Sequence, residues 1–347
     1  MNGTELTALN LGALAAWLAG SGIAHGEIHN ARVLAGGTQN LLLRFSYGGL
    51  DLVLRRPPPD RRGSSETVRR EAIVLATLDG TAVPHPRFRG LCEDPGVFGG
   101  AFLVMDEVRG FNAALCMPGS AASDPLFRHR MGLALVEGIA SLAAVPLNLG
   151  ELRSLGKTEG FIERQTQRWA AQLESYAASP RWPGAAALGP IAEVGAWLDA
   201  HRPGDYRPGL MHGDYHIANA MFRENDGELA AIVDWELTAL GDPLLDLGRL
   251  TTVWPNERNE SLLSLKVEPW AGFPPVEELI ARYAELTGRS MRSLPWFQVL
   301  ACYKYAVILE GTHARACANQ ADAAIGARLH ASARGLINRA TALLEAA

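Results

Sequence analysis

The first hundred residues alternate short apolar runs with glycine-containing turns. The runs at residues 41–46 and 50–55 flank a Gly-Gly turn at Gly48, and a further apolar segment, GAFLVMDEVRG, ends at Gly110. Short runs joined by glycine turns are typical of antiparallel strands. The pattern therefore predicts a small antiparallel sheet in this part of the chain.

One helix is expected within the sheet region. In the segment SSETVRREAIVLATL, Val68, Ala72, Leu75 and Leu78 recur at the spacing of one helix face. Glu66 lies in the first turn, where a carboxylate interacts favourably with the helix dipole. Together the sheet and this helix would form a first lobe.

From residue 125 onward the apolar positions follow helical spacing in several long segments. One polar segment interrupts them, LMHGDYHIANAMFRENDGELAAIVDWE at residues 210–236. A chain of 347 residues exceeds the length over which one hydrophobic core usually grows. We therefore expect an α+β fold with two lobes, a small antiparallel sheet in residues 1–108 and a mostly helical part in residues 109–347.

Charge and cysteine content narrow the class of protein. The net charge is −5 and the isoelectric point is near 6.0, and there is no long basic block, which argues against a nucleic-acid or anionic-membrane partner. The four cysteines form no C-x-x-C pair, as is typical of reduced thiols in the cytoplasm. No apolar stretch reaches the roughly 18 residues of a membrane span. A protein that acts on small molecules is expected.

The polar segment contains a predicted β-hairpin. Strands at residues 220–223 and 228–233 would flank a turn with Asp-Gly at its tip. Counting outward from that turn places Asn219 and Asp234 nearly opposite each other, with Cα atoms roughly 4.5 to 5.5 Å apart. Both side chains could then hold one small cation. Asp214 precedes Asn219 in a loop that begins His-Gly-Asp, and it would bring a third oxygen group to the same place.

Oxygen-rich sites with room for water and phosphates suit Mg²⁺ and phosphoryl transfer. The spacing Asp-x4-Asn, followed by an Asp at the end of a hairpin, repeats an arrangement found in protein kinases. The longer pattern HGDYHIAN…IVDWELTALGDPLLDL strongly resembles the aminoglycoside phosphotransferase and choline kinase family, which are small-molecule relatives of protein kinases. This resemblance implies a bilobal protein-kinase-like fold that uses Mg²⁺ and ATP.

The resemblance also implies roles for individual residues. Asp214 would orient the acceptor hydroxyl and take its proton, while Asn219 and Asp234 would hold Mg²⁺ on the nucleotide phosphates. His212 would brace the loop without transferring protons.

Three further acids in or after this segment have less direct roles. Asp242 precedes a proline and is a natural N-cap, and in the family the Gly-Asp-Pro-x-x-Asp segment supports the catalytic loop. Asp246 would share that support. Glu236 is either close to the metal or a surface acid, and His216 is expected to be an ordinary loop residue.

The first lobe supplies candidate nucleotide contacts. Arg55 ends the segment LVLR, in the place where protein kinases carry a strand lysine that contacts the nucleotide phosphates. Glu71 lies in an apolar helix stripe, where an unpaired carboxylate would be costly, so we expect it to pair with Arg55. Arginine differs from lysine in being forked and always ionised. Alternatively Arg56 contacts phosphate, or both arginines are surface charges.

Two backbone segments complete the expected nucleotide site. In LAGGTQN, Gly36, Gly37 and Thr38 could offer N–H donors to phosphates. The resemblance places the hinge between the lobes in the segment Asp-Glu-Val, where backbone groups of Glu107 and Val108 would contact adenine.

The acceptor is predicted from charge and from a closer resemblance. From residue 248 to the end there are nine acidic and eleven Lys or Arg residues, which gives no acidic excess for an aminoglycoside. Segments such as LVLRRPPP, DWELTALGDPLLDLGRL and AVILEGTHARA resemble the kinase domains associated with acyl-CoA dehydrogenases. This implies a functional link to such a dehydrogenase and a hydroxy-acyl acceptor or its CoA thioester, with Arg249, Lys304 or Arg315 facing the anionic part.

The expected function is therefore that of an ATP-dependent O-phosphotransferase acting on a hydroxyl of a small molecule. Two alternatives stay open: a nucleotide-binding scaffold with a kinase-like fold and little turnover, and an aminoglycoside-modifying kinase. A pair of histidines at His25 and His29 has no further ligands nearby in sequence and is not expected to bind metal.

Overall fold

The computed structural model describes residues 10–34, 40–58, 63–256, 262 and 266–346. The predicted phosphate contacts Gly36, Gly37 and Thr38 lie outside these residues.

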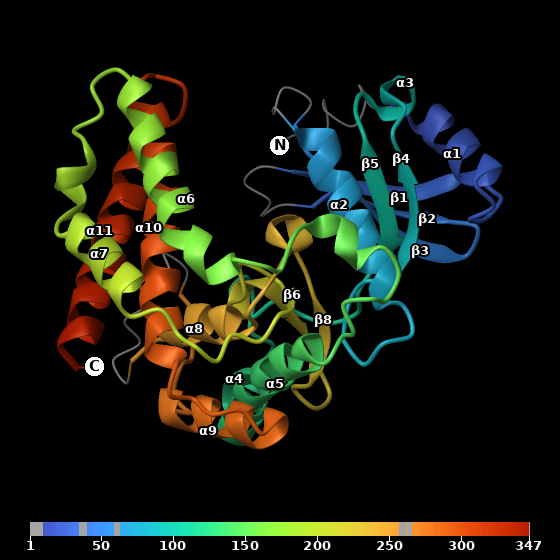
Figure 1. The fold of residues 1–347 in the computed structure, drawn as a ribbon. Coiled ribbons are helices and arrows are strands. Elements are labelled where there is room, and N and C mark those ends of the chain that lie inside the picture. The colour runs from blue at the N-terminus through green and yellow to red at the C-terminus, as the bar shows by residue number, and fades with distance from the viewer. Residues whose placement is uncertain (1–9, 35–39, 59–62, 257–261, 263–265, 347) are drawn as a thin grey trace.

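The first lobe is built on one antiparallel sheet (Figure 1). Its strands pair in the order β1-β2-β3-β5-β4, and the register of β2 with β3 follows the turn at Gly48 and Gly49. The strands are β1 (Ile28–Val33), β2 (Leu41–Tyr47), β3 (Leu50–Arg56), β4 (Phe88–Cys92) and β5 (Phe102–Asp106). The antiparallel strands predicted from the apolar runs are confirmed, although the last of them ends four residues before Gly110.

The two faces of this sheet bury different side chains. Phe45 and Leu54 pack with Leu14 and Leu18 of helix α1 (Leu11–Gly20) and with the short helix α3 (Pro95–Phe98). Helix α2 (Ser64–Leu78) covers the other face. Successive strand residues point to opposite faces. At the end of β3, Arg55 and Arg56 therefore point to opposite faces of the sheet.

The second lobe is mostly helical, as predicted. Its helices are α4 (Gly119–Ser123), α5 (Pro125–Ala143), α6 (Phe161–Ser175), α7 (Ile191–Ala200), α8 (Leu244–Val253), α9 (Val276–Thr287), α10 (Leu294–Cys317) and α11 (Ala323–Ala346). Two small antiparallel sheets interrupt them, one formed by β6 (Gly209–Met211) and β9 (Ala239–Gly241), the other by β7 (Ala220–Phe222) and β8 (Leu229–Ile232).

The two lobes share one hydrophobic core, which includes Leu75 of α2 and Phe222 of the second lobe. The β7–β8 hairpin is bonded to the chain segments that precede β4 and follow β5. The Ile232 N–H donates to the Pro84 carbonyl over 2.9 Å, and Phe111 and Phe222 exchange backbone hydrogen bonds. The domain boundary near residue 108 stays a prediction.

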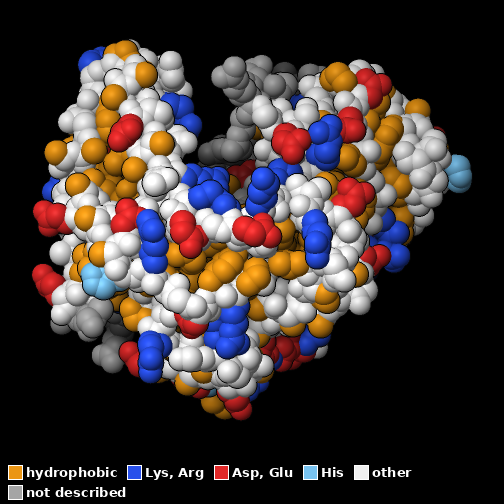
Figure 2. Space-filling view, viewed as in Figure 1, with side chains coloured by type: hydrophobic (Ala, Val, Ile, Leu, Met, Phe, Trp, Pro, Cys, Tyr) orange, Lys and Arg blue, Asp and Glu red, His pale blue; other side chains and the backbone are white. Residues whose placement is uncertain are grey.

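The space-filling view shows a hollow between helices α6, α7, α10 and α11, at the left, and the first lobe, at the upper right (Figure 2). Lys and Arg side chains gather at the floor of this hollow. Among the described residues, no helix is both long and apolar enough to cross a lipid bilayer.

A buried ion pair holds the start of α8. The Asp242 side chain has no exposed surface and accepts the backbone N–H groups of Arg207 and Leu244, each over 3.0 Å. Its two carboxylate oxygens also face the guanidinium of Arg289, with Oδ2 and Nη2 2.7 Å apart. The N-cap position of α8 is Pro243, and Asp242, predicted to be the cap, bonds to the first helical N–H from one residue earlier. Arg289 adds a partner that the local sequence pattern does not indicate.

Removing Arg289 would leave the Asp242 charge buried without its cation. We expect Arg289→Met to lower the free energy of unfolding by about 3–5 kcal/mol. Adding Asp242→Asn should recover part of this loss, because the remaining amide is neutral. Urea unfolding of both single variants, the double variant and an Arg292→Met control measures the coupling. Strictly additive losses would show that the two side chains do not depend on each other.

Candidate active site

The β7–β8 hairpin brings Asn219 close to the residue before Asp234. The strands pair Ala220 with Ile232, and the Asn219 carbonyl accepts the Val233 N–H over 2.9 Å. Asn219 therefore lies opposite Val233, one residue from the predicted partner Asp234. An unshifted count outward from the turn would place Asn219 opposite Ile232; the register shift between Met221 and Phe222 moves the opposite residue to Val233 and so brings Asp234 one residue closer.

The loop before the hairpin begins with a tight turn at Gly213. Its φ of +86° is in the left-handed region, and a Cβ added there would lie 2.1 Å from the Leu237 carbonyl oxygen. Only glycine fits without displacing the backbone. The Asp246 carboxylate fixes the same turn, because it accepts the His212 N–H over 2.7 Å and the Gly213 N–H over 2.9 Å.

The His212 ring joins this loop to the end of the hairpin. Nε2 lies 2.9 Å from the Val233 carbonyl oxygen and Nδ1 lies 3.3 Å from the Asp214 backbone nitrogen. A neutral ring with its proton on Nε2 satisfies both contacts, donating to Val233 and accepting from Asp214. Burial lowers the pKa of His212, which favours that neutral form.

Asp214 lies at the centre of a polar cluster. Its Oδ1 accepts from Nε of Arg249 over 3.2 Å, and Oδ2 lies 3.5 Å from Nε2 of His216. Its backbone carbonyl accepts the Asn219 side-chain Nδ2 over 2.9 Å. This last contact fixes the Asn219 amide so that its oxygen is the atom available to a cation.

Two neighbours keep the Asp214 carboxylate charged. Burial alone would raise its pKa, but His216 and Arg249 outweigh burial and hold the pKa below its usual range. His216, expected to be an ordinary loop residue, therefore contacts the central carboxylate. Its position two residues after Asp214 is the one local signal of this role.

Helix α10 holds the loop at residues 212–214 from the other side. The carbonyl of Gly213 accepts the hydroxyl of Tyr305 and, over 2.7 Å, the ammonium of Lys304. The Arg249 guanidinium stacks on the Tyr305 ring at 3.7 Å from its centroid. Lys304 is one of the cations expected to face an acceptor, but its ammonium is bonded to the Gly213 backbone carbonyl.

Arg315, the third cation expected to face an acceptor, lies elsewhere. It is exposed near the end of α10 and donates to the Thr312 hydroxyl in the same helix. Among the three residues, Arg249 alone contacts the Asp214 carboxylate.

The first lobe reaches this cluster through Arg55. Its guanidinium lies 2.7 Å from Glu71, 2.6 Å from Asp234 and 3.2 Å from Glu236. The expected ion pair of Arg55 with Glu71 is therefore present. Burial raises the pKa of Glu71 to about 7, with Arg55 acting in the opposite direction. Glu236, left open between a metal neighbour and a surface acid, is a partner of Arg55.

Arg56 points to the opposite face of the sheet. It donates to the Phe98 carbonyl over 2.5 Å and lies 5.7 Å from the centroid of the Phe98 ring. Arg56 is therefore not the arginine directed at Asp234, and both alternatives, phosphate contact by Arg56 and two surface arginines, disagree with the structure.

The predicted hinge follows directly from β5. The Glu107 N–H donates to the Asp51 carbonyl over 2.9 Å, and the Glu107 carboxylate accepts from Nε of Arg44 over 3.0 Å. Both contacts anchor the segment to the sheet. Contacts of Glu107 and Val108 backbone groups with a nucleotide stay a prediction.

Comparison with known proteins agrees with this geometry. Residues 30–286 match the family described as "Phosphotransferase enzyme family". The chain belongs to this phosphotransferase family. The solved structures similar to it include a Ralstonia eutropha protein classed provisionally as an aminoglycoside phosphotransferase, with a TM-score of 0.77 and 25% identity over 97% of this chain and 98% of that one. The predicted bilobal kinase-like α+β fold is confirmed.

Two further relatives give context for this phosphotransferase. Mouse (Mus musculus) acyl-CoA dehydrogenase family member 10 is 28% identical over 284 residues, which are 79% of this chain and 25% of the relative. The expected resemblance to this branch is confirmed, and the chain spans between a quarter and two fifths of the length of such curated relatives. A spectinomycin phosphotransferase solved with ADP and spectinomycin has a TM-score of 0.61 at 14% identity, over 95% of this chain and 97% of that one, and shows the fold alone.

The acidic cluster of this phosphotransferase fits a divalent cation. The single guanidinium of Arg55 faces three carboxylates, so negative charge remains in excess. The Asp234 side chain is 43% exposed, and its backbone adopts the left-handed conformation with φ of 70°. Non-glycine residues in that conformation are uncommon and concentrate at functional sites. Asp234 and Asn219 offer the carboxylate and amide oxygens that Mg²⁺ accepts.

The stability of the folded protein should depend on pH through Lys304. Burial lowers the pKa of its ammonium group to about 8, against an ordinary value of 10.5, although Asp214 and Asp246 act in the opposite direction. At a pH between these two values, Lys304 is protonated in the unfolded chain and has lost its proton in the folded protein. The unfolding free energy contributed by Lys304 therefore rises with pH across this window.

We expect Lys304→Met to abolish that rise. The unfolding free energy of the native protein minus that of the variant should increase between about pH 7.5 and about pH 9.5. Urea unfolding at several pH values measures the difference, and Lys266→Met, which alters an exposed lysine, should leave the profile unchanged. Parallel profiles of the native protein and Lys304→Met would contradict the assignment.

Proposed function

We propose that this protein transfers the γ-phosphoryl group of ATP to a hydroxyl of a small anionic molecule, a hydroxy-acyl compound or its CoA thioester. The observation that carries the proposal is the gathering of Asp214, Asn219 and Asp234 around one loop and hairpin, with Arg55 of the first lobe bonded to Asp234. Family membership supports the reaction class.

Arg55 is the proposed contact to the α- and β-phosphates of the nucleotide. Glu71 holds its guanidinium from α2 over 2.7 Å, which corresponds to the strand-cation and helix-acid pair of protein kinases. Gly36, Gly37 and Thr38 would cover the phosphates, and backbone groups of Glu107 and Val108 would contact the adenine. These nucleotide contacts rest on the family resemblance.

Asn219 and Asp234 are the proposed Mg²⁺ ligands. When bound, Mg²⁺ would neutralise charge on the phosphates. The fixed amide of Asn219 and the exposed carboxylate of Asp234 support this assignment. Asp246, His212 and Asp242 would keep the ligands in place through the backbone contacts described above.

Asp214 is the proposed catalytic residue. The acceptor hydroxyl oxygen would form the new bond to phosphorus while the bond from phosphorus to the oxygen of departing ADP breaks, and the hydroxyl proton would pass to Asp214. Because the pKa of Asp214 is held below its usual range, it is a weak base. Its main contribution would be to orient the hydroxyl, with proton transfer late in the reaction.

Arg249 supports an anionic acceptor. A guanidinium beside the proposed catalytic carboxylate attracts a carboxylate or a phosphate group of CoA, and it repels the ammonium groups of an aminoglycoside. The similarity to acyl-CoA dehydrogenase family proteins supports a hydroxy-acyl compound in particular, and a functional link to such a dehydrogenase is part of the proposal. An aminoglycoside acceptor is the less favoured candidate.

A nucleotide-binding scaffold with little turnover is the second candidate function. The observation in its favour is the ion pair between Arg55 and Asp234, at 2.6 Å. In this pair Arg55 lies where Mg²⁺ would bind Asp234, and Asp234 lies where a phosphate would bind Arg55. Measuring turnover separates the two functions.

Asp214→Asn should slow phosphoryl transfer while leaving nucleotide binding intact. Loss of a positioned base reduces the rate by about 10²- to 10⁴-fold. The assay is ADP release with a panel of hydroxyacyl-CoA thioesters, free hydroxy acids, choline and aminoglycosides. Asp226→Asn, at the far end of the same hairpin, is the matched control and should keep the native rate.

Two results of this assay would count against the proposal. If native protein binds Mg·ATP and transfers phosphate to none of the acceptors, the scaffold function is favoured. If Asp214→Asn retains the native rate, Asp214 is not the catalytic residue.

Arg249→Gln should raise the KM for an anionic acceptor by about 10-fold or more, since a charged hydrogen bond is worth roughly 1.5–3 kcal/mol. The KM for ATP should stay near its native value, because Arg249 contacts Asp214 and not Arg55 or Asp234. The matched control is Arg153→Gln, which removes an exposed arginine. Equal changes in the two KM values, or preference of native protein for a polycationic acceptor, would contradict an anion-binding role.

A further inference from the structure

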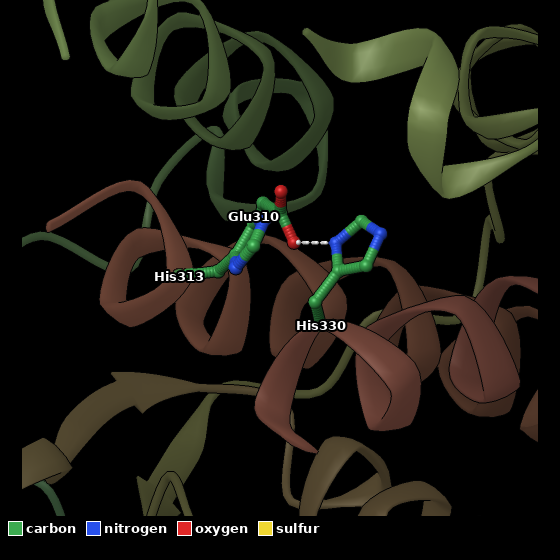
Figure 3. A group of neighbouring side chains, drawn as sticks. All are labelled: Glu310, His313 and His330. Atoms are coloured by element: carbon green, nitrogen blue, oxygen red, sulfur yellow. Dashed lines mark hydrogen bonds and ion pairs between the residues drawn. The ribbon is translucent and has the colours of Figure 1, made fainter. Parts of the chain in front are cut away.

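A second cluster of metal-ligating side chains lies where α10 and α11 pack together. Glu310, His313 and His330 each place one ligand atom within 4.8 Å of the other two. Figure 3 shows His330 pointing from α11 toward the Glu310 carboxylate, with His313 beside Glu310 on α10. The cluster begins six residues beyond Lys304, about 9 Å further along the helix axis, and none of its members belongs to the proposed phosphotransfer site.

Glu310 is oriented as a metal-binding carboxylate would be. It has no exposed surface, and its Oε1 accepts the indole N–H of Trp182 over 2.6 Å. Its Oε2 lies 2.7 Å from Nδ1 of His330. Carboxylate ligands in metal sites are commonly held by such a hydrogen bond to one oxygen while the other is directed at the ion.

His313 supplies a ring nitrogen without a partner. Its Nδ1 is buried and, among the described residues, accepts or donates no hydrogen bond. A buried polar atom without a partner is costly. Its other ring nitrogen, Nε2, lies 3.6 Å from Sγ of Cys317, on the same helix. A hydrogen-bonded Glu310–His330 pair would need no ligand, but it leaves this nitrogen unexplained.

Close packing of the two helices preforms the cluster. A Cβ added to Gly326, one turn before His330 on α11, would lie 2.4 Å from the Cβ of Ala316 on α10. The His313 and His330 rings are 4.4 Å apart between centroids. Ligands of tetrahedral zinc lie about 3.3 Å from one another, given metal–ligand bonds of about 2.0–2.1 Å. Small rotations of the two rings would bring the three atoms to that separation.

We propose that Glu310, His313 and His330 bind a divalent transition-metal ion, with Zn²⁺ the best match. Two imidazoles and one carboxylate form a known zinc ligand set, in which water completes the fourth position. Binding would displace the proton between His330 and Glu310. The site is structural: it joins α10 to α11 and, through Trp182, to the loop before α7, and α10 carries the Lys304 and Tyr305 contacts to Gly213.

The test is a Zn²⁺ titration of the full chain after treatment with a chelator, in competition with a chromophoric zinc indicator. Native protein should bind one equivalent at this site. Loss of a residue that only supports a metal ligand weakens metal binding by roughly 10- to 100-fold. His313→Ala and His330→Ala each remove a ligand, so each should weaken zinc binding by at least this factor. His29→Ala, which removes an exposed histidine of the first lobe, is the matched control and should bind as tightly as native protein.

Thermal unfolding provides a second measurement that does not depend on phosphotransfer. Zn²⁺ should raise the Tm of native protein and of His29→Ala, because an ion that binds only the folded state stabilises it. It should leave the Tm of His313→Ala unchanged. His313→Ala removes no hydrogen bond from Nδ1, so the variant should fold, and Glu310→Gln, which can still accept from Trp182, gives a second variant. Native protein that binds no zinc, or variants that bind it equally well, would overturn the proposal.

Discussion

The geometry of the candidate active site depends on one carboxylate, that of Asp246. It is almost completely buried and accepts the backbone N–H groups of His212 and Gly213. Burial raises its pKa, so the two N–H donors matter for keeping it ionised. With this turn fixed to α8, the Gly213 carbonyl meets Lys304 and Tyr305 of α10. Asp214, the next residue, is thereby held from two sides.

A second constraint links the lobes. The guanidinium of Arg55 is buried, and it bonds to Glu71 from α2 and to Asp234 and Glu236 from the end of the hairpin. The three carboxylates repel one another, and a single guanidinium offsets only part of this repulsion. Burial raises the pKa of Glu71 to about 7, Arg55 acts in the opposite direction, and the charges of Asp234 and Glu236 add to the rise. One guanidinium facing three carboxylates is the electrostatic reason to expect a divalent cation here.

Local sequence patterns predicted the strands of the first lobe, α2, the hairpin and the pairing of Arg55 with Glu71. Each depends on short-range spacing, or on the cost of burying a charge in an apolar helix stripe. The pattern could not place residues brought together by tertiary packing. Arg289 reaches Asp242 across 47 residues and Lys304 reaches Gly213 across 91, and no local signal marks either partner. Asn219 and Asp234 lie within one residue of being opposite, and the register shift that brings them this close is not visible in the apolar pattern.

The ion pair of Arg55 with Asp234 has a consequence for how a nucleotide would enter. Both groups are already satisfied at rest, so in the proposed reaction binding is an exchange of partners and not a simple addition of contacts. Only the difference between the old and new contacts contributes to affinity, and the fraction of molecules with the pair opened limits the apparent binding constant. A substitution that tightened this pair would thus make the resting protein more ordered and its hold on the nucleotide weaker.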